Sequence, residues 1–373
     1  MKIAILKERA SGETRVAVTP ETAKKFAALG LSVAVEAGAG DTASITDVAY
    51  VEAGATVADA GATVKDADIV LGIQAPDVAL LKGAQAGAWV AALFDPFTKR
   101  DVVDAYAAAG FEALSMEFMP RITRAQSMDV LSSQSNLAGY KAVLAAADAY
   151  GRAFPMMMTA AGTVQAARAF IMGVGVAGLQ AIATARRLGA QVSATDVRSA
   201  TKEQIQSLGA KPIFVENVAG IEGEGSGGYA TEMSEEYQKA QAELVSSHIA
   251  KQDIVITTAL IPGRAAPRLI TDAQIATMKP GSVIFDLAVA QGGNVEGSVP
   301  DEVVIKHGVK IIGYSNTPAA LPADASALFA RNHYNFLSAF WDKEAGRPVL
   351  DEEIGNAIRL TQGGKVVNER LTG

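Results

Sequence analysis

The sequence contains no cysteine among its 373 residues. Without thiols the chain has no disulfide, no thiolate nucleophile, no zinc ribbon and no iron–sulfur site. Histidine is almost as rare, since only His248, His307 and His333 are present, and we interpret all three as structural or surface residues. A metal centre or catalytic triad would have to be built from these histidines or from carboxylates, so we predict neither.

Basic residues are also few, because 33 Lys and Arg stand against 40 Asp and Glu, and the net charge is -7. A chain of this charge has no general attraction for phosphate backbones, so we expect no nucleic-acid partner. Long apolar runs are missing too. The most apolar stretch, residues 154–172, carries Arg168 and the helix breakers Pro155 and Gly162. We therefore expect neither a membrane span nor a signal peptide, and predict a cytoplasmic protein.

The chain has ample apolar mass for packed cores, with 49% hydrophobic residues, and its length predicts two domains at roughly 150 residues each. Short β-like runs alternate with helical stretches, and a second such series begins near Arg168. Strands separated by helices of this length predict βαβ units and a parallel sheet. We expect strands at residues 2–6, 31–36, 68–73, 89–94, 111–116, 169–172, 191–197, 212–215, 254–258, 282–287 and 309–314, and helices at 19–30, 102–109, 131–150, 178–188, 201–208, 232–249 and 323–341.

The sharpest local signal is a glycine turn, with Gly173, Gly175 and Gly178 placed between an apolar run and an amphipathic helix. The first glycine permits a tight turn, the second lets the backbone approach a pyrophosphate, and the third lets helix and strand pack closely. The N–H groups at the start of the helix favour phosphate binding. The pattern predicts dinucleotide binding, and the alternative is a tight βα turn without a ligand.

An acidic residue, Asp196, stands at the end of the next expected strand, 18 residues after Gly178. A carboxylate at this point accepts hydrogen bonds from ribose hydroxyls and repels a 2′-phosphate, which favours NAD over NADP. Arg198 would by itself favour NADP, but one arginine beside the aspartate does not outweigh it. We therefore predict an NAD site.

Two further segments leave alternatives open. The polar side chains between Arg121 and Ser132 would surround a carboxamide and a ribose at a domain junction, or simply begin a capped helix with a solvated face. Residues 220–229 hold five glycines, two glutamates and Tyr229. This composition is typical of a surface loop, and the tyrosine either closes over a ligand as a lid or is incidental. Residues 257–263 and the segment after Asp286 follow expected strands and give supporting signals only.

Taken together, five segments resemble the alanine dehydrogenase and proton-translocating nicotinamide nucleotide transhydrogenase family. The resemblance extends over nearly the whole chain, and the RAQSMD sequence and the tyrosine-bearing loop resemble the NAD(H)-binding first domain of the transhydrogenase α-subunit. The segments are KERASGETRVAVTP (7–20), RITRAQSMDVLSSQSNLAGY (121–140), GVGVAGLQAIATARRLGAQVSATDVR (173–198), TTALIPG (257–263) and FDLAVAQGGN (285–294).

The resemblance implies an α/β fold of two Rossmann-like, doubly wound parallel-sheet domains with a cleft between them. The first would comprise residues 1–130 and 320–373, completed by the C-terminal helix, and the second residues 131–319, with a mobile loop near 220–230. The family's catalytic and nicotinamide-side residues would be Arg121, Gln126, Asp129, Ser132 and the lid Tyr229, and the rest of the NAD site would be Gly173, Gly175, Val176, Gly178, Asp196, Val197, Arg198, Gly228 and Leu260.

Four positions of the alanine dehydrogenase pattern show which branch of this family the chain resembles. The resembling alanine dehydrogenases place an Arg near the N-terminus, a Lys before a Pro, a His after an apolar strand and an Asp before Gln-Gly-Gly. Arg15 matches the first of these positions. The Lys position holds Gln74, the His position falls in the region of Asp95, and the Asp position holds Ala290. Amino-acid oxidation needs acid–base help of about 10²–10⁴ in rate, whereas hydride transfer between two nicotinamides needs positioning alone. The substitutions favour the transhydrogenase branch.

The resemblance also implies partners. NAD(H) would bind this chain, and NADP(H) would bind the NADP(H)-binding domain of the transhydrogenase β-subunit. A membrane-spanning component would translocate protons, and the chain would form a homodimer, peripheral to the inner membrane. We expect the chain alone to bind NAD(H) without completing turnover. The alternatives are an amino-acid dehydrogenase of the same fold and a non-catalytic NAD-sensing module.

Overall fold

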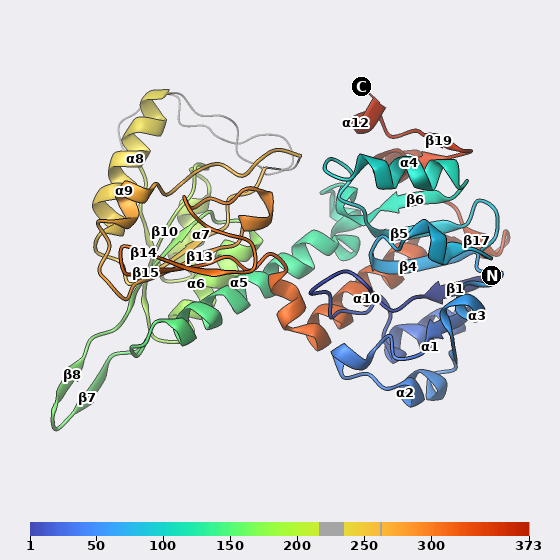
Figure 1. Ribbon diagram of the computed structural model, residues 1–373, viewed down its shortest axis with the longest axis horizontal. Helices are drawn as coiled ribbons and strands as arrows, with labels where there is room; N and C mark the ends of the chain where they lie inside the picture. Colours follow the sequence, from blue (N-terminus) through green and yellow to red (C-terminus); the bar gives the residue numbers. More distant parts are fainter. Residues whose placement is uncertain (216–234, 262, 373) are drawn as a thin grey trace. The chain divides into compact units, whose positions relative to one another are not determined.

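The computed structural model describes residues 1–215, 235–261 and 263–372 and divides the chain into two compact units (Figure 1). Unit 1 consists of Met1–Gln134 and Pro318–Gly373, and unit 2 consists of Ser135–Thr317. The C-terminal segment therefore belongs to the same unit as the N-terminus. Helix α5 (Val130–Ala149) contains the boundary between Gln134 and Ser135.

Unit 1 is built on a six-stranded sheet with the order β3-β2-β1-β4-β5-β6, in which every pair of strands is parallel. This is the strand order of the Rossmann fold, and it reverses direction between β1 and β4. Apart from the edge strand β3, which has no buried residue, the strands are short and mostly buried apolar runs, as expected of a parallel sheet. They are β1 (Lys2–Ile5), β2 (Ser32–Glu36), β3 (Thr56–Ala58), β4 (Ile69–Gln74), β5 (Trp89–Leu93) and β6 (Glu112–Ser115).

The helices of unit 1 begin at the capping signals of the sequence. Helix α1 (Pro20–Ala28) starts after Thr19, which forms a capping box with Thr22, and Pro20 occupies its first turn. The other elements are α2 (Asp47–Glu52), α3 (Ala60–Val64), α4 (Arg100–Ala108), α10 (Pro322–Ala339), α11 (Glu352–Ile358) and α12 (Glu369–Thr372), with the small strands β16 (Trp341–Asp342), β17 (Arg347–Pro348), β18 (Thr361–Gln362) and β19 (Lys365–Val366).

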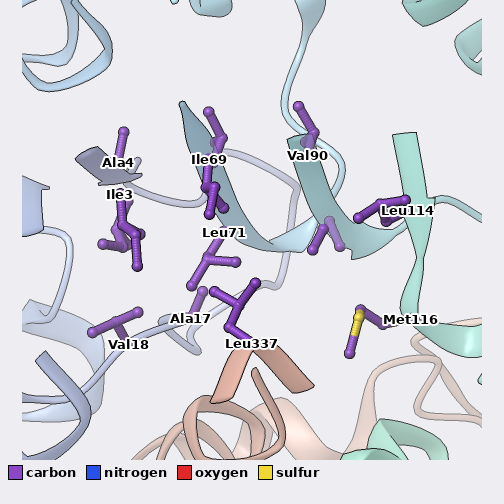
Figure 2. Close-up of a cluster of buried hydrophobic side chains, with 14 of the residues drawn as sticks. Ile3, Ala4, Ala17, Val18, Ile69, Leu71, Val90, Leu114, Met116 and Leu337 are labelled. Atoms are coloured by element: carbon purple, nitrogen blue, oxygen red, sulfur yellow. The ribbon is translucent and has the colours of Figure 1, made fainter. Parts of the chain in front are cut away.

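Helix α10 forms part of the core of unit 1. Its side chains Phe329, Phe336 and Leu337 are at most 1% exposed. Figure 2 shows Leu337 beside Leu71 of β4 and Ala17. Burying a side chain of this size contributes about 1.5–3 kcal/mol, so the C-terminal segment is a structural component of the first sheet's core.

Unit 2 contains a seven-stranded sheet with the order β11-β10-β9-β12-β13-β15-β14. Its strands pair in parallel except for β14 and β15. The elements are β9 (Arg168–Met172), β10 (Gln191–Thr195), β11 (Lys211–Pro212), β12 (Ile254–Thr257), β13 (Val283–Asp286), β14 (Val303–Lys306) and β15 (Val309–Ile312), with helices α6 (Val176–Arg187), α7 (Thr201–Ser207), α8 (Glu235–Ile249) and α9 (Asp272–Ile275).

The edge strand β14 was not predicted from the sequence. It joins β15 through a two-residue turn in which His307 and Gly308 have φ of 52° and 78°. Positive φ at both central positions is typical of tight hairpins. The usual sequence signal for such a turn is Asn-Gly or Asp-Gly, and His-Gly does not give it.

A second unpredicted feature is the hairpin of β7 (Met157–Thr159) and β8 (Gly162–Val164), which projects from the rest of unit 2 (Figure 1). Its first arm carries Met156, Met157 and Met158, which are 60%, 43% and 78% exposed. Three exposed methionines in succession form an apolar surface in a segment that sequence analysis interpreted only as apolar.

The prediction of an α/β fold with Rossmann-like parallel sheets is confirmed. The loop expected at residues 220–229, including Gly228 and Tyr229, lies outside the described residues. Within the described residues of the chain, no helix combines the length and the apolar character needed to cross a bilayer.

The buried histidine of α10 gives a prediction for stability. His333 is fully buried, its Nδ1 lies 3.4 Å from the carbonyl oxygen of Ala17, and its ring packs edge-on against Phe329. Its Nε2 has no hydrogen-bond partner among the described residues. Burial lowers the pKa of His333 from its usual value of 6.5 to about 4. Between these pH values the unfolded chain binds a proton at this histidine and the folded chain does not.

We therefore expect the free energy of unfolding to fall as pH decreases from about 6.5 to about 4, with His333 contributing at most about 1.4 kcal/mol per pH unit. Urea unfolding at several pH values should show a shallower pH dependence for His333→Leu than for the unsubstituted chain. Phe336→Leu, at another fully buried but non-titrating position of α10, serves as the control and should leave the slope unchanged. An equal slope in His333→Leu would contradict the assignment.

Candidate functional site

The turn between β9 and α6 has a backbone path that only glycine permits at two of its positions. Gly173 has φ of 97°, and a Cβ added there would lie 2.5 Å from Oγ1 of Thr258. A Cβ on Gly178 would lie 1.9 Å from the carbonyl oxygen of Gly173. These two glycines are therefore required by packing, as the sequence pattern predicts.

Gly175 differs from the other two glycines because an added Cβ would meet no atom within 4 Å. Packing within the described chain therefore does not explain a glycine here. Helix α6 begins directly after Gly175, and no described side chain caps that start. The N–H groups of the first turn carry partial positive charge, and the open space at Gly175 lets an anionic group approach them.

The acidic residue after β10 fixes the same turn. Asp196 is 7% exposed; its Oδ2 accepts from the backbone N of Val174 at 2.6 Å and from Nη2 of Arg198 at 2.9 Å. Its Oδ1 accepts from the backbone N and Nε of Arg198 at 2.9 and 2.8 Å. Burial opposes the charged form, but the hydrogen bonds from Arg198 and Val174 outweigh burial and lower the pKa of Asp196. The turn is thus held by an ionised carboxylate.

The charge balance at this carboxylate bears on nucleotide choice. The guanidinium of Arg198 is paired with Asp196, so its positive charge is largely compensated at the strand end. Val197 lies between them and is partly exposed. A 2′-phosphate would meet the carboxylate as well as the guanidinium, which favours a nucleotide without that phosphate.

A third strand end contributes Leu260, which follows β12 and is 39% exposed. Two residues earlier, Oγ1 of Thr258 donates to the carbonyl oxygen of Gly173 at 3.0 Å. Strands β10, β9 and β12 are neighbours in the sheet. The structure thus brings together the predicted residues of unit 2 at adjacent strand ends: Gly173, Gly175, Val176, Gly178, Asp196, Val197, Arg198 and Leu260.

Of the predicted polar residues of unit 1, Arg121 lies just before the 3₁₀ helix η4 (Thr123–Met128), Gln126 lies within it, and Asp129 and Ser132 lie at the start of α5. Oδ1 of Asp129 accepts from the backbone N of Ser132 at 2.9 Å, and Oδ2 accepts from the hydroxyl of Ser132 at 2.5 Å. This pair caps the start of α5. Arg121 and Gln126 are exposed.

The segment that carries Gln126 is held by residues far away in the sequence. The carbonyl oxygen of Ser127 accepts from Nδ2 of Asn332 at 2.8 Å and from Nδ2 of Asn335 at 3.0 Å. Arg124 forms ion pairs with Asp351 and Glu353 at the start of α11. Sequence reasoning missed these C-terminal residues, because nothing in their local pattern indicates a contact with η4.

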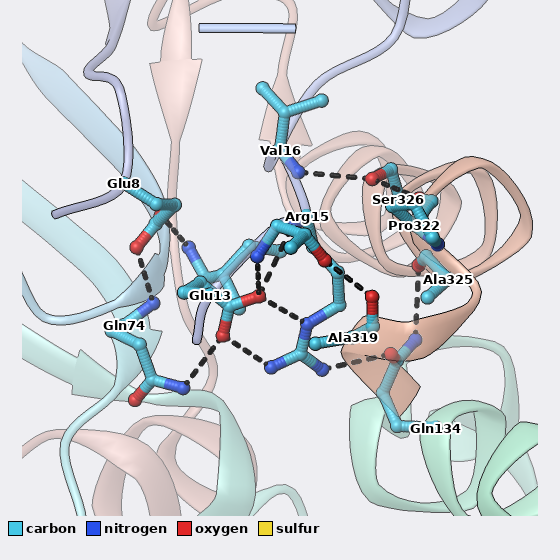
Figure 3. A network of polar contacts seen from close by, with 12 residues as sticks. Glu8, Glu13, Arg15, Val16, Gln74, Gln134, Ala319, Pro322, Ala325 and Ser326 are labelled. Carbon is cyan, nitrogen blue, oxygen red and sulfur yellow. Dashed lines mark hydrogen bonds and ion pairs between the residues drawn. The ribbon is translucent and has the colours of Figure 1, made fainter. Parts of the chain in front are cut away.

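Arg15, which the sequence analysis compared with the arginine of the resembling alanine dehydrogenases, lies in a buried network (Figure 3). Arg15 is 3% exposed and donates to both carboxylate oxygens of Glu13, from Nε at 2.7 Å and from Nη2 at 2.6 Å. Its Nη1 donates to Oε1 of Gln134 at 2.9 Å. A substrate carboxylate would have to displace Glu13 from this guanidinium, so Arg15 stabilises unit 1 in this structure.

The neighbouring position, Gln74, is also engaged within the network. Its Nε2 donates to Oε2 of Glu13 at 3.2 Å, while the backbone N of Ile73 and of Gln74 donate to Glu8 at 2.6 and 3.3 Å. Burial raises the pKa of Glu8 to about 7, although these backbone hydrogen bonds oppose the rise. A glutamine at 74 has no proton to exchange near neutral pH.

Among the described residues, no group of three or more His, Asp or Glu side chains is arranged to hold a metal ion. The two loop residues expected beside the nicotinamide, Gly228 and Tyr229, lie outside the described residues.

The contrast between Gly175 and Gly178 gives a direct test of ligand binding at the turn. Gly175→Ala should fold normally, and it should weaken NADH binding by about tenfold or more, because the methyl group fills the space that a pyrophosphate approaches. Gly178→Ala should lower the melting temperature, because its Cβ collides with the carbonyl of Gly173. NADH fluorescence titration and thermal unfolding separate the two effects. Unchanged NADH affinity in Gly175→Ala would contradict a ligand at this turn.

Comparison with known proteins agrees with this geometry. The families described as "Alanine dehydrogenase/PNT, N-terminal domain" and "Alanine dehydrogenase/PNT, C-terminal domain" match residues 4–138 and 142–369. A protein of Rhodospirillum rubrum that forms the first portion of NAD(P) transhydrogenase subunit alpha is 54% identical over 100% of this chain and 99% of its own length.

Two further relatives support the same assignment. The corresponding subunit alpha portion from Rickettsia prowazekii (strain Madrid E) is 46% identical over 99% of this chain and 96% of its own length. The crystal structure of transhydrogenase from Sinorhizobium meliloti is 51% identical, with a TM-score of 0.90, and the match covers 98% of this chain and 100% of that one. The chain therefore belongs to the alanine dehydrogenase/PNT family and, within it, to the α-subunits of NAD(P) transhydrogenase, which are oxidoreductase subunits.

Proposed function

We propose that this chain is the NAD(H)-binding component of a proton-translocating nicotinamide nucleotide transhydrogenase. Hydride passes directly between NAD(H) held here and NADP(H) held on the NADP(H)-binding domain of the β-subunit. A membrane-spanning component couples this transfer to proton translocation, and keeps the chain peripheral to the inner membrane. The observation that carries the proposal is the open approach to Gly175 beside the ionised Asp196.

The residues of unit 2 hold the adenosine and phosphate portion of the nucleotide. The first turn of α6 donates backbone N–H groups to the pyrophosphate, and Gly175 leaves room for it. Asp196 and Arg198 meet the ribose of the adenosine, with Val197 and Leu260 as apolar neighbours. The neutral Arg198–Asp196 pair admits NAD(H) more readily than NADP(H).

The residues of unit 1 serve the nicotinamide portion. Arg121, Gln126, Asp129 and Ser132 orient the carboxamide and the ribose, and Tyr229 with Gly228 closes over them. When bound, the reduced nicotinamide ring supplies a hydride, which carries both electrons, so no side chain needs to accept a proton. These residues therefore act by orienting the ring and excluding water, and the capping pair of Asp129 and Ser132 supports this by fixing the start of α5.

Amino-acid oxidation is the first alternative, and the network around Arg15 argues against it. That reaction needs a group to receive the substrate carboxylate and a group to exchange protons. Arg15 is bound by Glu13, and Gln74 replaces a lysine that could exchange a proton. The second alternative, an NAD-sensing module without catalysis, would bind NADH but never exchange hydride with a partner.

Hydride exchange tests the proposed function. Purified chain is mixed with the soluble NADP-binding partner domain, deuterium-labelled NADH and NADP⁺, and the label is followed into NADPH. We expect transfer only when both proteins are present, and no NADH production from alanine and NAD⁺. Tight NADH binding without transfer would contradict the proposal, as would robust NADP⁺ reduction by the chain alone.

Two variants test the nicotinamide-side roles in the same assay. Gln126→Ala and Tyr229→Phe should each slow hydride transfer by about tenfold or more, because both changes remove positioning contacts. Thermal unfolding of Gln126→Ala should be unaffected, since Gln126 is exposed. Arg9→Gln, which alters an exposed ion pair with Glu36, is the matched control and should retain the full rate. Transfer at the unsubstituted rate in both variants would show that these residues do not have the proposed roles.

The homodimer belongs to the same proposal, and the hairpin β7–β8 offers a surface for it. Met156, Met157 and Met158 expose apolar area that a second copy of the chain would bury. The double variant Met156→Lys/Met158→Lys should shift the chain towards monomer in sedimentation velocity, because each lysine would have to lose its water in the interface. Val349→Lys, at an exposed apolar position in unit 1, is the control. A double variant that dimerises as well as the unsubstituted chain would exclude this surface.

A further inference from the structure

The carbonyl group of Gly173 has a hydrogen-bond donor that the glycine pattern does not contain. Thr258, the residue after β12, donates from Oγ1 to this oxygen at 3.0 Å. The fit is close, since a Cβ on Gly173 would lie 2.5 Å from the same hydroxyl, and a Cβ on Gly178 would lie 3.5 Å from it. Thr258 therefore reaches the interior of the glycine turn from a neighbouring strand.

The peptide next to Thr258 is held in turn by an asparagine. Oδ1 of Asn294 accepts from the backbone N of Ala259 at 3.1 Å, and its Nδ2 donates to the carbonyl oxygen of Ala259 at 2.9 Å. The same Nδ2 donates to the carbonyl oxygen of Pro267 at 2.8 Å. Asn294 is fully buried, so its amide has no contact with water and depends on these three hydrogen bonds for its polar partners.

The position of Asn294 is itself fixed by the buried carboxylate at the end of β13. Oδ1 of Asp286 accepts from the backbone N of Ala288 at 3.0 Å and of Asn294 at 3.2 Å, and Oδ2 accepts from the backbone N of Val295 at 3.2 Å. Gly293 has φ of 77°, and a Cβ there would lie 2.7 Å from Oδ2 of Asp286. This explains why a glycine directly precedes Asn294.

The resulting chain of bonds runs from Asp286 through Asn294 and Ala259 to Thr258 and Gly173. It complements the two bonds that hold the turn from the other side, from the N of Gly173 to the carbonyl of Thr195 at 2.9 Å and from the N of Val174 to Asp196. If the Thr258 hydroxyl is removed, the peptide between Gly173 and Val174 keeps its N–H partner but loses the partner of its carbonyl.

We propose that Thr258 and Asn294 are positioning residues for the phosphate-binding turn, and that they hold the Gly173 carbonyl so that the turn has its ligand-receiving shape before the nucleotide arrives. The proposal rests on the proposed NAD(H) function. Donors that are already oriented lose less freedom on binding, so their affinity for a pyrophosphate is higher. Neither residue touches the reacting atoms.

The test compares three variants of the full chain. Thr258→Val keeps the shape and removes the hydroxyl, Thr258→Ser restores the hydroxyl, and Asn294→Asp removes both amide donors. Thr184→Val is the matched control, because among the described residues the buried hydroxyl of Thr184 bonds only to Gln180 of its own helix, accepting from its side chain and donating to its carbonyl. NADH, ADP and adenosine are titrated against each protein, and thermal unfolding is recorded without ligand.

We expect Thr258→Val and Asn294→Asp to weaken NADH and ADP binding by about tenfold, with adenosine binding unchanged because adenosine has no phosphate. Thr258→Ser should recover NADH affinity, and Thr184→Val should retain it. Equal losses for ADP and adenosine, or a lower melting temperature with unchanged NADH affinity, would overturn the proposal. If Thr258→Val does not fold, the same comparison of NADH and ADP binding with adenosine binding is made on Asn294→Asp, and its result decides. Failure of the unsubstituted chain to bind NADH would instead refute the proposed function.

Discussion

The chain must reverse sharply between β9 and α6 while its first helical N–H groups stay open to an anion, and the neighbouring strand ends of unit 2 are arranged around this constraint. The reversal brings the carbonyl of Gly173 so close to Gly178 that no side chain fits between them. A backbone without side chains is flexible, so its shape has to be fixed from outside. Asp196 on one neighbouring strand end and Thr258 on the other supply that support.

The two sheets share the spatial order of their first five strands but use their strand ends differently. In unit 1 the backbone N–H groups at the end of β4 donate to the carboxylate of Glu8, and Arg15 is paired with Glu13. In unit 2 the turn after β9 ends at Gly175, where space remains. The same fold thus provides a charged structural network in one unit and a candidate phosphate site in the other.

Sequence patterns predicted those helices, strands and turns that are determined by residues close together in the chain. The capping box before α1, the apolar strand runs and the glycine turn were all readable, because each depends on residues within a few positions of one another. Hairpin β7–β8 was missed because methionines in succession give no alternation of polar and apolar residues. Strand β14 was missed because its turn is His-Gly.

The residues that hold the site in place could not be predicted from the sequence for a different reason. Asn332 contacts the carbonyl of Ser127 across 205 positions of sequence, and Asn294 contacts Ala259 across 35. No spacing rule links such pairs, since it is the tertiary fold of each unit that brings them together. The sequence analysis treated the segment after Asp286 as a supporting signal only, whereas the structure shows that it contains a buried side chain, Asn294, that holds the end of another strand.

The central claim is that this chain selects NAD(H) through a glycine turn whose neighbouring carboxylate opposes a 2′-phosphate. Its most direct test is to titrate the purified chain with NADH and with NADPH at the same salt concentration and to measure equilibrium binding by nucleotide fluorescence. The result predicted is saturable NADH binding, with NADPH weaker by about tenfold or more, equivalent to roughly 1.4 kcal/mol. Equal affinities, or a preference for NADPH, would contradict the role assigned to Asp196.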